Sequence, residues 1–428
     1  MTKRIDKQQF LASINKHVSR YRNLTPKSQV ILWHSNAMEF VTRLLALAQL
    51  DVDIILPPNS QAQTLADLST ITEFYAGECL ESVPPKMQLL DEQSEGIKSE
   101  DELLWPSNDK ATNLIFFTSG SSGPAKAITR SWHAINTELE TLQSTFGTNL
   151  KEPQFIAMVS HQHIYGLLFK LLWPLRFGHH IEMQTYEYPE HLQNRIAVAG
   201  KWVIVASPAQ LSRLAQDNVL VANKGDIACV FSSGGPLKDN DAIRLYQQLC
   251  LPVTQVYGST ETGGIGYRDV VDNSLSPWQP FYGIEVSQSD RQLMLSSVLI
   301  SEKQRLLDDL GSVLSDGRFI LKGRADRTVK VAEKRINLVG MEARLNAHEW
   351  VDDCVIVRLQ SGRLGALVEL NDAISYVTEK KHISQALKLW LSAEFEAVCI
   401  PRKWRYLESL PYNPQGKLVY TQLEQYFV

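Results

Sequence analysis

Nine consecutive residues, Thr118-Ser-Gly-Ser-Ser-Gly-Pro-Ala-Lys126, carry groups that can hold phosphate oxygens. Gly120 and Gly123 can adopt positive φ, which lets several backbone N–H groups turn toward one point. Lys126 adds a positive charge, and the spacing of a Walker A loop is absent. The hydroxyl donors are Thr118, Ser119, Ser121 and Ser122. The same residue types also occur in ordinary polar surface turns, so the segment alone leaves both interpretations open.

The elements around this loop must position it. Residues 114–117 form an apolar run (Leu-Ile-Phe-Phe) that predicts a buried strand. Ile128 and residues 132–142 follow with a helical pattern of apolar residues. The local pattern therefore predicts a strand, a glycine-rich loop and a helix.

The composition excludes several classes of protein. The 428 residues suffice for two or more domains, and 44% hydrophobic with 21% charged residues is typical of a soluble globular protein. A net charge of −4 without a basic block gives nucleic-acid or anionic-membrane binding no electrostatic support. The five scattered cysteines predict neither a disulfide framework nor a zinc site, but a reducing cytoplasm. No signal peptide or membrane span is expected, because the first residues are polar and no apolar run is long enough.

Short apolar runs alternate with helical patterns along the first two thirds of the chain. Strand candidates lie at residues 30–33, 52–56, 155–159, 202–206, 227–231 and 253–256, and an amphipathic helix lies at 39–49. Such alternation predicts an α/β fold with parallel sheets. Residues 91–102 contain six acidic residues and are predicted to be a solvated linker.

The pattern changes near residue 280. Alternating segments at 284–286 and 293–295 suggest a small antiparallel β subdomain. Beyond Gly323 come a charged hairpin-like segment (325–338), a helix (341–350), strands (354–359 and 366–370) and a helix (383–397). We therefore expect a large N-terminal domain (1–322) and a small α+β C-terminal domain (323–428).

Five further motifs follow the glycine-rich loop in order. They are Ser160-His-Gln-His-Ile-Tyr-Gly166, Ser233-Gly-Gly-Pro-Leu237, Tyr257-Gly-Ser-Thr-Glu261, Asp309-Leu-Gly311 with Gly323-Arg-Ala-Asp326, and Asn413-Pro-Gln-Gly-Lys417. Each is weakly specific, but the ordered series resembles the acyl-adenylate-forming superfamily, whose AMP-forming acyl-CoA and acyl-carrier-protein synthetases are the closest members. The resemblance covers residues 114–417 and is loose before them. It implies a C-terminal domain that moves during the reaction.

The resemblance implies a role for each motif in activating a carboxylate with ATP. The 118–126 loop would clamp the β- and γ-phosphates. The ring of Tyr257 would stack on adenine beside Gly258, Thr260 would contact the α-phosphate, and Glu261 would bind Mg²⁺, which prefers carboxylate and phosphate oxygens. Taken alone, this motif is also a strand end followed by a capped turn.

Two motifs would line the flat part of the ligand. Gly234, Gly235 and Pro236 match the turn that lines adenine and the acyl pocket in the family, although a plain turn after a strand explains them nearly as well. His163, Gly235 and Gly263 would border the acyl pocket. A core histidine is the other interpretation of His163, and His161 is expected to be structural. No aspartate lies in 160–166 to hold an α-amine, which favours an acid without one.

The last motifs would complete the site. Asp309 matches the family's ribose aspartate, although Leu307-Asp308 replaces the usual Thr-Gly before it. The other implied assignments are Arg324 beside the ribose, Asp326 as the hinge, Arg335 near the phosphate and Lys417 as the mobile cation of adenylation. Glu333 stands where the family has a glycine near the thiol acceptor, so the acceptor is open.

The resemblance therefore implies an ATP- and Mg²⁺-dependent acid–thiol ligase, with Thr118, Glu261 and Lys417 as its catalytic residues. A small carboxylic acid (aryl or fatty, without an α-amine) would form an acyl-adenylate, and the phosphopantetheine thiol of CoA or an acyl carrier protein would accept the acyl group. Two alternatives remain: a nucleotide-binding protein of the same fold without turnover, and an adenylating enzyme with a non-thiol acceptor.

Overall fold

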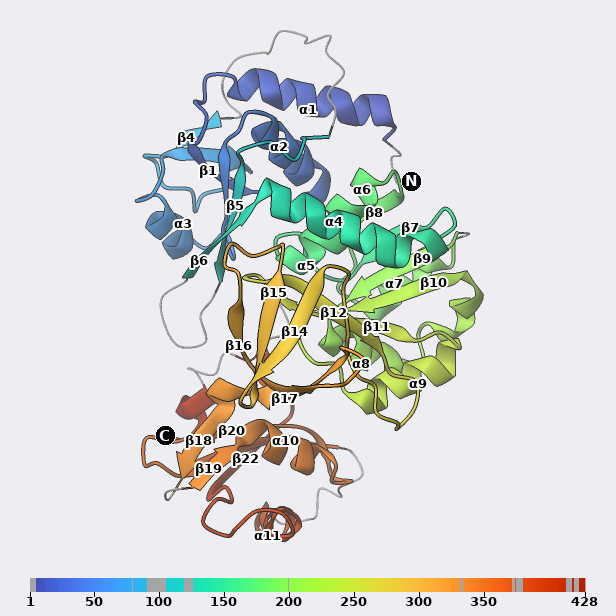
Figure 1. The fold of residues 1–428 in the computed structure, drawn as a ribbon, viewed down its shortest axis with the longest axis vertical. Coiled ribbons are helices and arrows are strands. Elements are labelled where there is room, and N and C mark those ends of the chain that lie inside the picture. Colours follow the sequence, from blue (N-terminus) through green and yellow to red (C-terminus); the bar gives the residue numbers. More distant parts are fainter. Residues whose placement is uncertain are drawn as a thin grey trace. The chain divides into compact units, whose positions relative to one another are not determined.

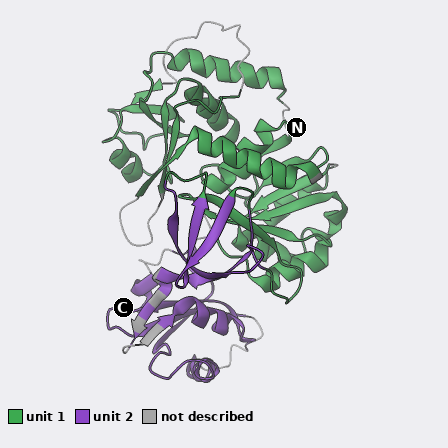
Figure 2. Cartoon of the chain, viewed as in Figure 1, with its two compact units in different colours: residues 1–276, 281–283, 297–301 green, residues 277–280, 284–296, 302–428 purple. Residues whose placement is uncertain are grey.

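The computed structural model describes residues 5–78, 80–90, 105–118, 126–198, 200–331, 334–371, 374, 380–412, 418 and 423–427. The chain divides into two compact units, coloured separately in Figure 2. Unit 1 comprises residues 1–276, 281–283 and 297–301. Unit 2 comprises residues 277–280, 284–296 and 302–428.

The first sheet of unit 1 has the strand order β4-β3-β1-β2-β5-β6. Figure 1 labels its strands β4, β1, β5 and β6. Its strands are β1 (Gln29–Trp33), β2 (Asp53–Leu56), β3 (Phe74–Gly77), β4 (Gln88–Leu89), β5 (Asn113–Thr118) and β6 (Lys126–Ser131). Its helices are α1 (Lys7–Tyr21), α2 (Ala37–Gln49) and α3 (Ala62–Leu68). The strands β4, β3, β1, β2 and β5 pair in parallel, as the alternation of strands and helices predicts.

β6 corrects the expectation for the segment after the glycine-rich loop. Residues 126–131 form a strand that pairs antiparallel with β5, with Thr118 opposite Lys126 and Leu114 opposite Arg130. The helix α4 (Trp132–Phe146) begins only where the Ser131 side chain accepts a hydrogen bond from Ala134 N. Ile128 therefore lies in a strand, because pairing with β5 outweighs a weak local helical pattern.

The strands of unit 1 in the second sheet have the order β12-β11-β10-β9-β7-β8. They are β7 (Gln154–Ala157), β8 (His180–Thr185), β9 (Trp202–Ala206), β10 (Ile227–Ser232), β11 (Val253–Ser259) and β12 (Gly263–Asp269). Between them lie η2 (Gly147–Asn149), α5 (Ile164–Gly166), η3 (Leu167–Leu172), α6 (Trp173–Arg176), α7 (Pro189–Ile196), α8 (Pro208–Asp217), η4 (Val221–Asp226) and α9 (Asp239–Leu249). All pairs are parallel except that of β11 with β12.

The central strand β9 explains how this sheet is buried on both faces. All five of its residues are buried, as expected for a continuous apolar run in a parallel sheet. Trp202 and Ile204 face apolar residues of α7, α8 and α9. On the other face, Trp173 of α6 packs against Phe155 of β7 and Phe231 of β10. Rigid layers on both sides therefore fix the ends of the parallel strands.

The described residues of unit 2 form three small sheets of their own, with the orders β14-β15-β16-β17, β18-β19 and β20-β21-β22. Its strands are β13 (Gln279–Pro280), β14 (Ile284–Ser289), β15 (Gln292–Ser297), β16 (Arg305–Val313), β17 (Phe319–Arg324), β18 (Thr328–Val331), β19 (Lys334–Asn337), β20 (Val351–Arg358), β21 (Leu364–Leu370) and β22 (Lys403–Leu407). Its helices are η5 (Ala325–Arg327), α10 (Leu338–Asn346), α11 (Lys380–Ser392) and η6 (Glu424–Phe427).

The predicted fold class, α/β with parallel sheets, a small β subdomain and a C-terminal α+β region, is confirmed. The charged segment at 325–338 is a hairpin, β18 with β19. α10 begins at Leu338, earlier than the predicted 341, because Asn337 accepts hydrogen bonds from the N–H groups of Val339 and Gly340. The domain boundary at 322/323 and the mobility of the last domain stay predictions, and the acidic linker lies outside the described residues.

Candidate active site

Three of the predicted motifs follow parallel strands of the second sheet. The segment 160–166 follows β7, the turn 233–236 follows β10, and Tyr257 lies near the end of β11. The strands β7, β9, β10 and β11 run in parallel, so their carboxyl ends share one edge of the sheet. Ligands of open α/β sheets bind at this edge. The fold therefore gathers motifs that are up to about a hundred residues apart in the sequence.

The turn after β10 is attached to the neighbouring strand. Ser233 Oγ donates a hydrogen bond to Val256 O, at 2.8 Å. Gly234 and Gly235 are exposed, and nothing lies within 4 Å of the position that a Cβ would occupy on Gly234. On Gly235, a Cβ would meet only Pro208 Cγ, at 3.8 Å. This turn therefore has open space for a flat group beside its backbone.

The Tyr257–Glu261 motif is the tip of a hairpin formed by β11 and β12. Tyr257 pairs with Gly266 and Gly258 with Gly264. A Cβ on Gly258 would lie 2.2 Å from Gly263 O, so only glycine fits where the strands approach so closely. The hairpin places Thr260 and Glu261, both partly exposed, in its turn.

Thr262, which the motif comparison did not include, shapes this turn. Ser259 N donates to Thr262 Oγ1 at 3.1 Å, and Thr262 N donates to Ser259 Oγ at 3.3 Å. Reciprocal bonds of this kind hold a short turn in one conformation. The signal in the sequence was the spacing of the two hydroxyl residues across Thr260 and Glu261.

The two histidines of the segment after β7 differ in environment. His163 is partly exposed and precedes α5. His161 is 3% exposed, and its Nε2 lies 3.0 Å from His34 O. Burial, assisted by the charge of Lys170, lowers the pKa of His161 to about 4, so the ring is neutral at pH 7. This environment agrees with the structural role expected for His161.

Lys170, which follows the 160–166 segment, is also a buried polar residue, and its burial was not predicted from the sequence. It lies in η3, a π-helical segment, and is fully buried. Its Nζ donates a hydrogen bond to Thr185 Oγ1, at 2.6 Å. Burial lowers the pKa of Lys170 to about 7, although the Glu182 carboxylate acts in the opposite direction.

The glycine-rich loop connects the ends of β5 and β6. Thr118 is the last residue of β5 and lies opposite Lys126, the exposed first residue of β6. Ser119, Gly120, Ser121, Ser122 and Gly123 lie outside the described residues. The structure therefore fixes the two ends of the loop: Thr118 closes a central parallel strand, and Lys126 opens an edge strand.

Unit 2 carries the residues expected at the ribose and the hinge. Asp309 of β16 lies directly opposite Arg324 of β17. Arg324 Nη2 also lies 3.3 Å from Asp308 Oδ2, and both of these side chains are largely exposed. Asp326 lies in η5 and Arg335 in β19, each described by its backbone alone. Glu333 and Lys417 lie outside the described residues.

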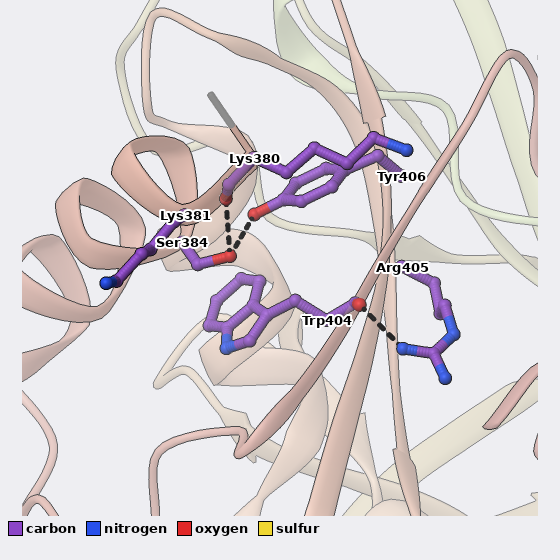
Figure 3. Close-up of a pocket in the computed structure, with 6 residues that line it drawn as sticks. All are labelled: Lys380, Lys381, Ser384, Trp404, Arg405 and Tyr406. Carbon is purple, nitrogen blue, oxygen red and sulfur yellow. Dashed lines mark hydrogen bonds between the residues drawn. The ribbon is translucent and has the colours of Figure 1, made fainter. Parts of the chain in front are cut away.

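A cavity of about 310 Å³ lies between α11 and β22 in unit 2 (Figure 3). Its hydroxyl groups satisfy one another: Ser384 Oγ donates to Lys380 O at 2.8 Å and lies 2.7 Å from Tyr406 Oη. Figure 3 shows the amino groups of Lys380 and Lys381 pointing in different directions. Because its cations do not converge, the cavity does not form an anion site.

Comparison with known proteins assigns this arrangement to a family. Residues 20–291 match the family model described as AMP-binding enzyme. The chain belongs to this family. The 4-coumarate–CoA ligase of Halorhodospira halophila is a relative, 25% identical over 318 residues that span 74% of this chain and 78% of the relative. The 3,4-dihydroxybenzoate–[aryl-carrier protein] ligase of Bacillus anthracis is 21% identical over 315 residues, 73% of either chain.

Solved structures extend the likeness of this AMP-binding enzyme to nearly the whole fold. ATP-bound MatB from Rhodopseudomonas palustris has a TM-score of 0.82 over 99% of this chain and 94% of MatB, at 17% identity. The predicted superfamily and the prediction of an AMP-forming ligase are confirmed. Among the described residues, no helix has the length and apolar character needed to cross a membrane.

Proposed function

We propose that the protein is an ATP- and Mg²⁺-dependent acid–thiol ligase. Its substrate would be a small aryl or fatty acid without an α-amine, and its acceptor the phosphopantetheine thiol of CoA or an acyl carrier protein. The observation that carries the proposal is the shared carboxyl edge of the second sheet in unit 1, where the 160–166, 233–236 and 257–261 segments lie. The ligase names of the relatives support a carboxylic acid and a thiol acceptor. We further propose a cytoplasmic location.

The groups at this edge suit a magnesium nucleotide. No set of three or more His, Cys, Asp or Glu side chains in the described part of the chain is arranged to hold a metal. Mg²⁺ does not need such a set, since it is usually held by one or two carboxylates together with phosphate oxygens and water. Glu261 would supply that carboxylate, and bound Mg²⁺ would neutralise phosphate charge. The open backbone at Gly234 would accept the flat adenine, with Tyr257 beside it.

In the first step, a carboxylate oxygen attacks the α-phosphorus of ATP, the bond to the β-phosphate oxygen breaks, and pyrophosphate leaves. Two anions must be held in line, so positioning and charge neutralisation supply most of the catalysis. Thr118, Lys126 and the intervening residues would hold the β- and γ-phosphates. Thr260 would hydrogen-bond the α-phosphate, and Lys417 would balance charge on the reacting oxygens.

In the second step, the thiol sulfur attacks the acyl carbon, the bond to the AMP oxygen breaks, and the thiol proton passes to solvent. Asp309 would hold the ribose hydroxyls, with Arg324 opposite it and Arg335 near the phosphate. The C-terminal domain (323–428) would rotate about Asp326 between the steps. His163, Gly235 and Gly263 would line the acyl pocket.

A pyrophosphate-exchange assay over a panel of aryl, fatty and amino acids tests the first step. We expect exchange with at least one acid that lacks an α-amine and none without added Mg²⁺. Exchange confined to amino acids would refute the proposed substrate class. ATP binding without exchange for any acid would favour the nucleotide-binding alternative.

The variant Lys417→Ala tests the division of labour between the two steps. We expect adenylation to fall by about two to three orders of magnitude, as for loss of a group that stabilises transition-state charge. Thiol transfer from a supplied acyl-adenylate should survive, because the lysine would act only in the first step. An equal loss of both steps would contradict this assignment. Competition among CoA, carrier protein and small amines would identify the acceptor.

A further inference from the structure

Arg130 and Glu138 form a buried ion pair next to the proposed site. Arg130 lies in β6 and Glu138 in α4. Arg130 Nη2 lies 3.0 Å from Glu138 Oε2, and the two side chains are 2% and 7% exposed. A buried pair of charges is a weak source of stability, because both charges lose their hydration. A role beyond stability therefore has to be sought in the other contacts of the two residues.

Both members of the pair bind the hairpin that carries Thr260 and Glu261. Arg130 Nη1 donates a hydrogen bond to Thr260 O, at 3.2 Å. Glu138 Oε1 accepts a hydrogen bond from Gly264 N, at 2.7 Å. The first contact lies within the turn between β11 and β12, and the second lies in β12 just after it. The pair thus attaches the turn to β6 and α4.

Gly263 shows how closely the hairpin fits the pair. Its φ of +70° lies in the region that favours glycine. A Cβ there would lie 2.8 Å from both Arg130 Nη2 and Glu138 Oε2. The backbone of the hairpin therefore packs directly against the two charged groups.

We propose that Arg130 and Glu138 are positioning residues that fix the Thr260–Glu261 turn in the place where it meets the magnesium nucleotide. The bonds between Ser259 and Thr262 determine the shape of the turn, but they lie within it and cannot fix its location. The contacts of Arg130 and Glu138 come from other elements and supply that fixed point. A catalytic group must be held within about half an ångström of its productive position, and contacts from surrounding residues provide that support. This inference rests on the proposed function.

A second ion pair in unit 1 provides a matched control. Arg195 Nε lies 2.6 Å from Glu182 Oε2, with side chains 23% and 5% exposed. Arg195 lies in α7 and Glu182 in β8, away from the hairpin in the sequence and in the order of the sheet. Substitutions in this pair therefore disturb a buried charge without touching Thr260 or Gly264.

The experiment compares Arg130→Lys and Glu138→Gln with Arg195→Lys and Glu182→Gln. For each folded variant, pyrophosphate exchange gives kcat, the KM of the acid and the Mg²⁺ concentration for half-maximal rate, and thermal unfolding gives Tm. We expect Arg130→Lys and Glu138→Gln to raise the half-saturating Mg²⁺ concentration or lower kcat at least tenfold, with the KM of the acid changed less than twofold. The control variants should change Tm alone. Both pairs changing only Tm, or the acid KM rising as much as the Mg²⁺ requirement, would overturn the inference.

Binding of Mg²⁺-ATP by isothermal titration calorimetry separates this inference from the proposed function. If wild-type protein binds Mg²⁺-ATP without exchanging pyrophosphate, the proposed function fails. A Mg²⁺-dependent loss of affinity in Arg130→Lys, absent in Arg195→Lys, would then still support positioning. Equal affinities in these two variants would refute it, as would no Mg²⁺-ATP binding by wild-type protein.

Discussion

The buried Lys170 makes the stability of unit 1 depend on pH. Its side chain is fully buried, and its amino group donates a hydrogen bond to Thr185 Oγ1. Burial lowers its pKa from 10.5 to about 7. Between these two pH values the unfolded chain holds a proton that the folded lysine has released. Stability rises with pH wherever the unfolded state binds more protons, so wild-type protein should become more stable from pH 7 to pH 9.

The expected gain follows from this pKa difference. Each pH unit contributes about 1.4 kcal/mol while the unfolded lysine is charged and the folded one is neutral. Lys170 is half titrated at pH 7, which reduces the contribution of the first unit. The free energy of unfolding should therefore rise by about 2 kcal/mol between pH 7 and pH 9 because of this one residue. Lys170→Met should remove that rise.

Urea unfolding at pH 6, 7, 8 and 9 provides the measurement. Tryptophan fluorescence includes a signal from unit 1, because Trp173 and Trp202 are fully buried in it. Lys151→Met, at an exposed lysine, is the control for loss of a positive charge. The free energy of unfolding of wild-type protein should rise relative to that of Lys170→Met as the pH increases from 7 to 9. A difference that stays constant from pH 7 to pH 9 would refute a lowered pKa for Lys170.

Three further predictions concern other sites. Burial raises the pKa of Glu342 to about 7, so the folded protein binds this proton more tightly than the unfolded chain does. The free energy of unfolding should therefore fall as the pH rises from 5 to 7. Glu342→Gln should weaken that fall, as measured by urea unfolding. Gly263→Ala should lower the free energy of unfolding by about 1–3 kcal/mol more than Gly178→Ala does. Both glycines have positive φ, but only Gly263 has atoms within 3 Å of the new Cβ. Equal losses of unfolding free energy in the two variants would contradict the tight fit. Lys126→Met should raise the KM for ATP about tenfold and leave the KM of the acid unchanged, as for loss of one charge-assisted phosphate contact; a parallel rise of both KM values in exchange kinetics would argue against phosphate binding.

The parts of the fold that the sequence predicted are those in which local pattern and tertiary burial agree. Residues 202–206 are apolar throughout, and β9 covers the same residues, fully buried. β6 was missed because its alternation places one apolar side chain, Ile128, and one charged side chain, Arg130, on the buried face. An inward arginine weakens the strand pattern in the sequence, and its contacts with Glu138 and Thr260 O account for its burial.

A similar limit applies to the candidate site. The Tyr257–Glu261 motif is continuous in the sequence, so its position at the end of a strand could be predicted from a short window. The bond from Gly264 to Glu138 joins residues 126 positions apart, and the bond from Arg130 to Thr260 spans 130 positions. No periodicity or motif spacing connects such residues, since their proximity depends on how β6 and α4 pack against the hairpin. Residues that support a motif from other elements are therefore harder to predict than the motif.

The contacts around residues 324–327 support the proposed hinge at Asp326. On one side, Arg324 is fixed in β17 opposite Asp309 of β16. On the other, Arg327 pairs with Glu342 of α10 and donates to Ile356 O of β20 at 3.0 Å, and Glu342 Oε1 accepts from Ile356 N at 2.7 Å. A rotation that preserves both sets of contacts must be absorbed by the short segment between Arg324 and Arg327, which contains Asp326. We therefore propose that the backbone angles change in that segment, and that the hydrogen bond from Asn337 Nδ2 to Lys322 O, which joins the two sides at 3.1 Å, breaks during the rotation.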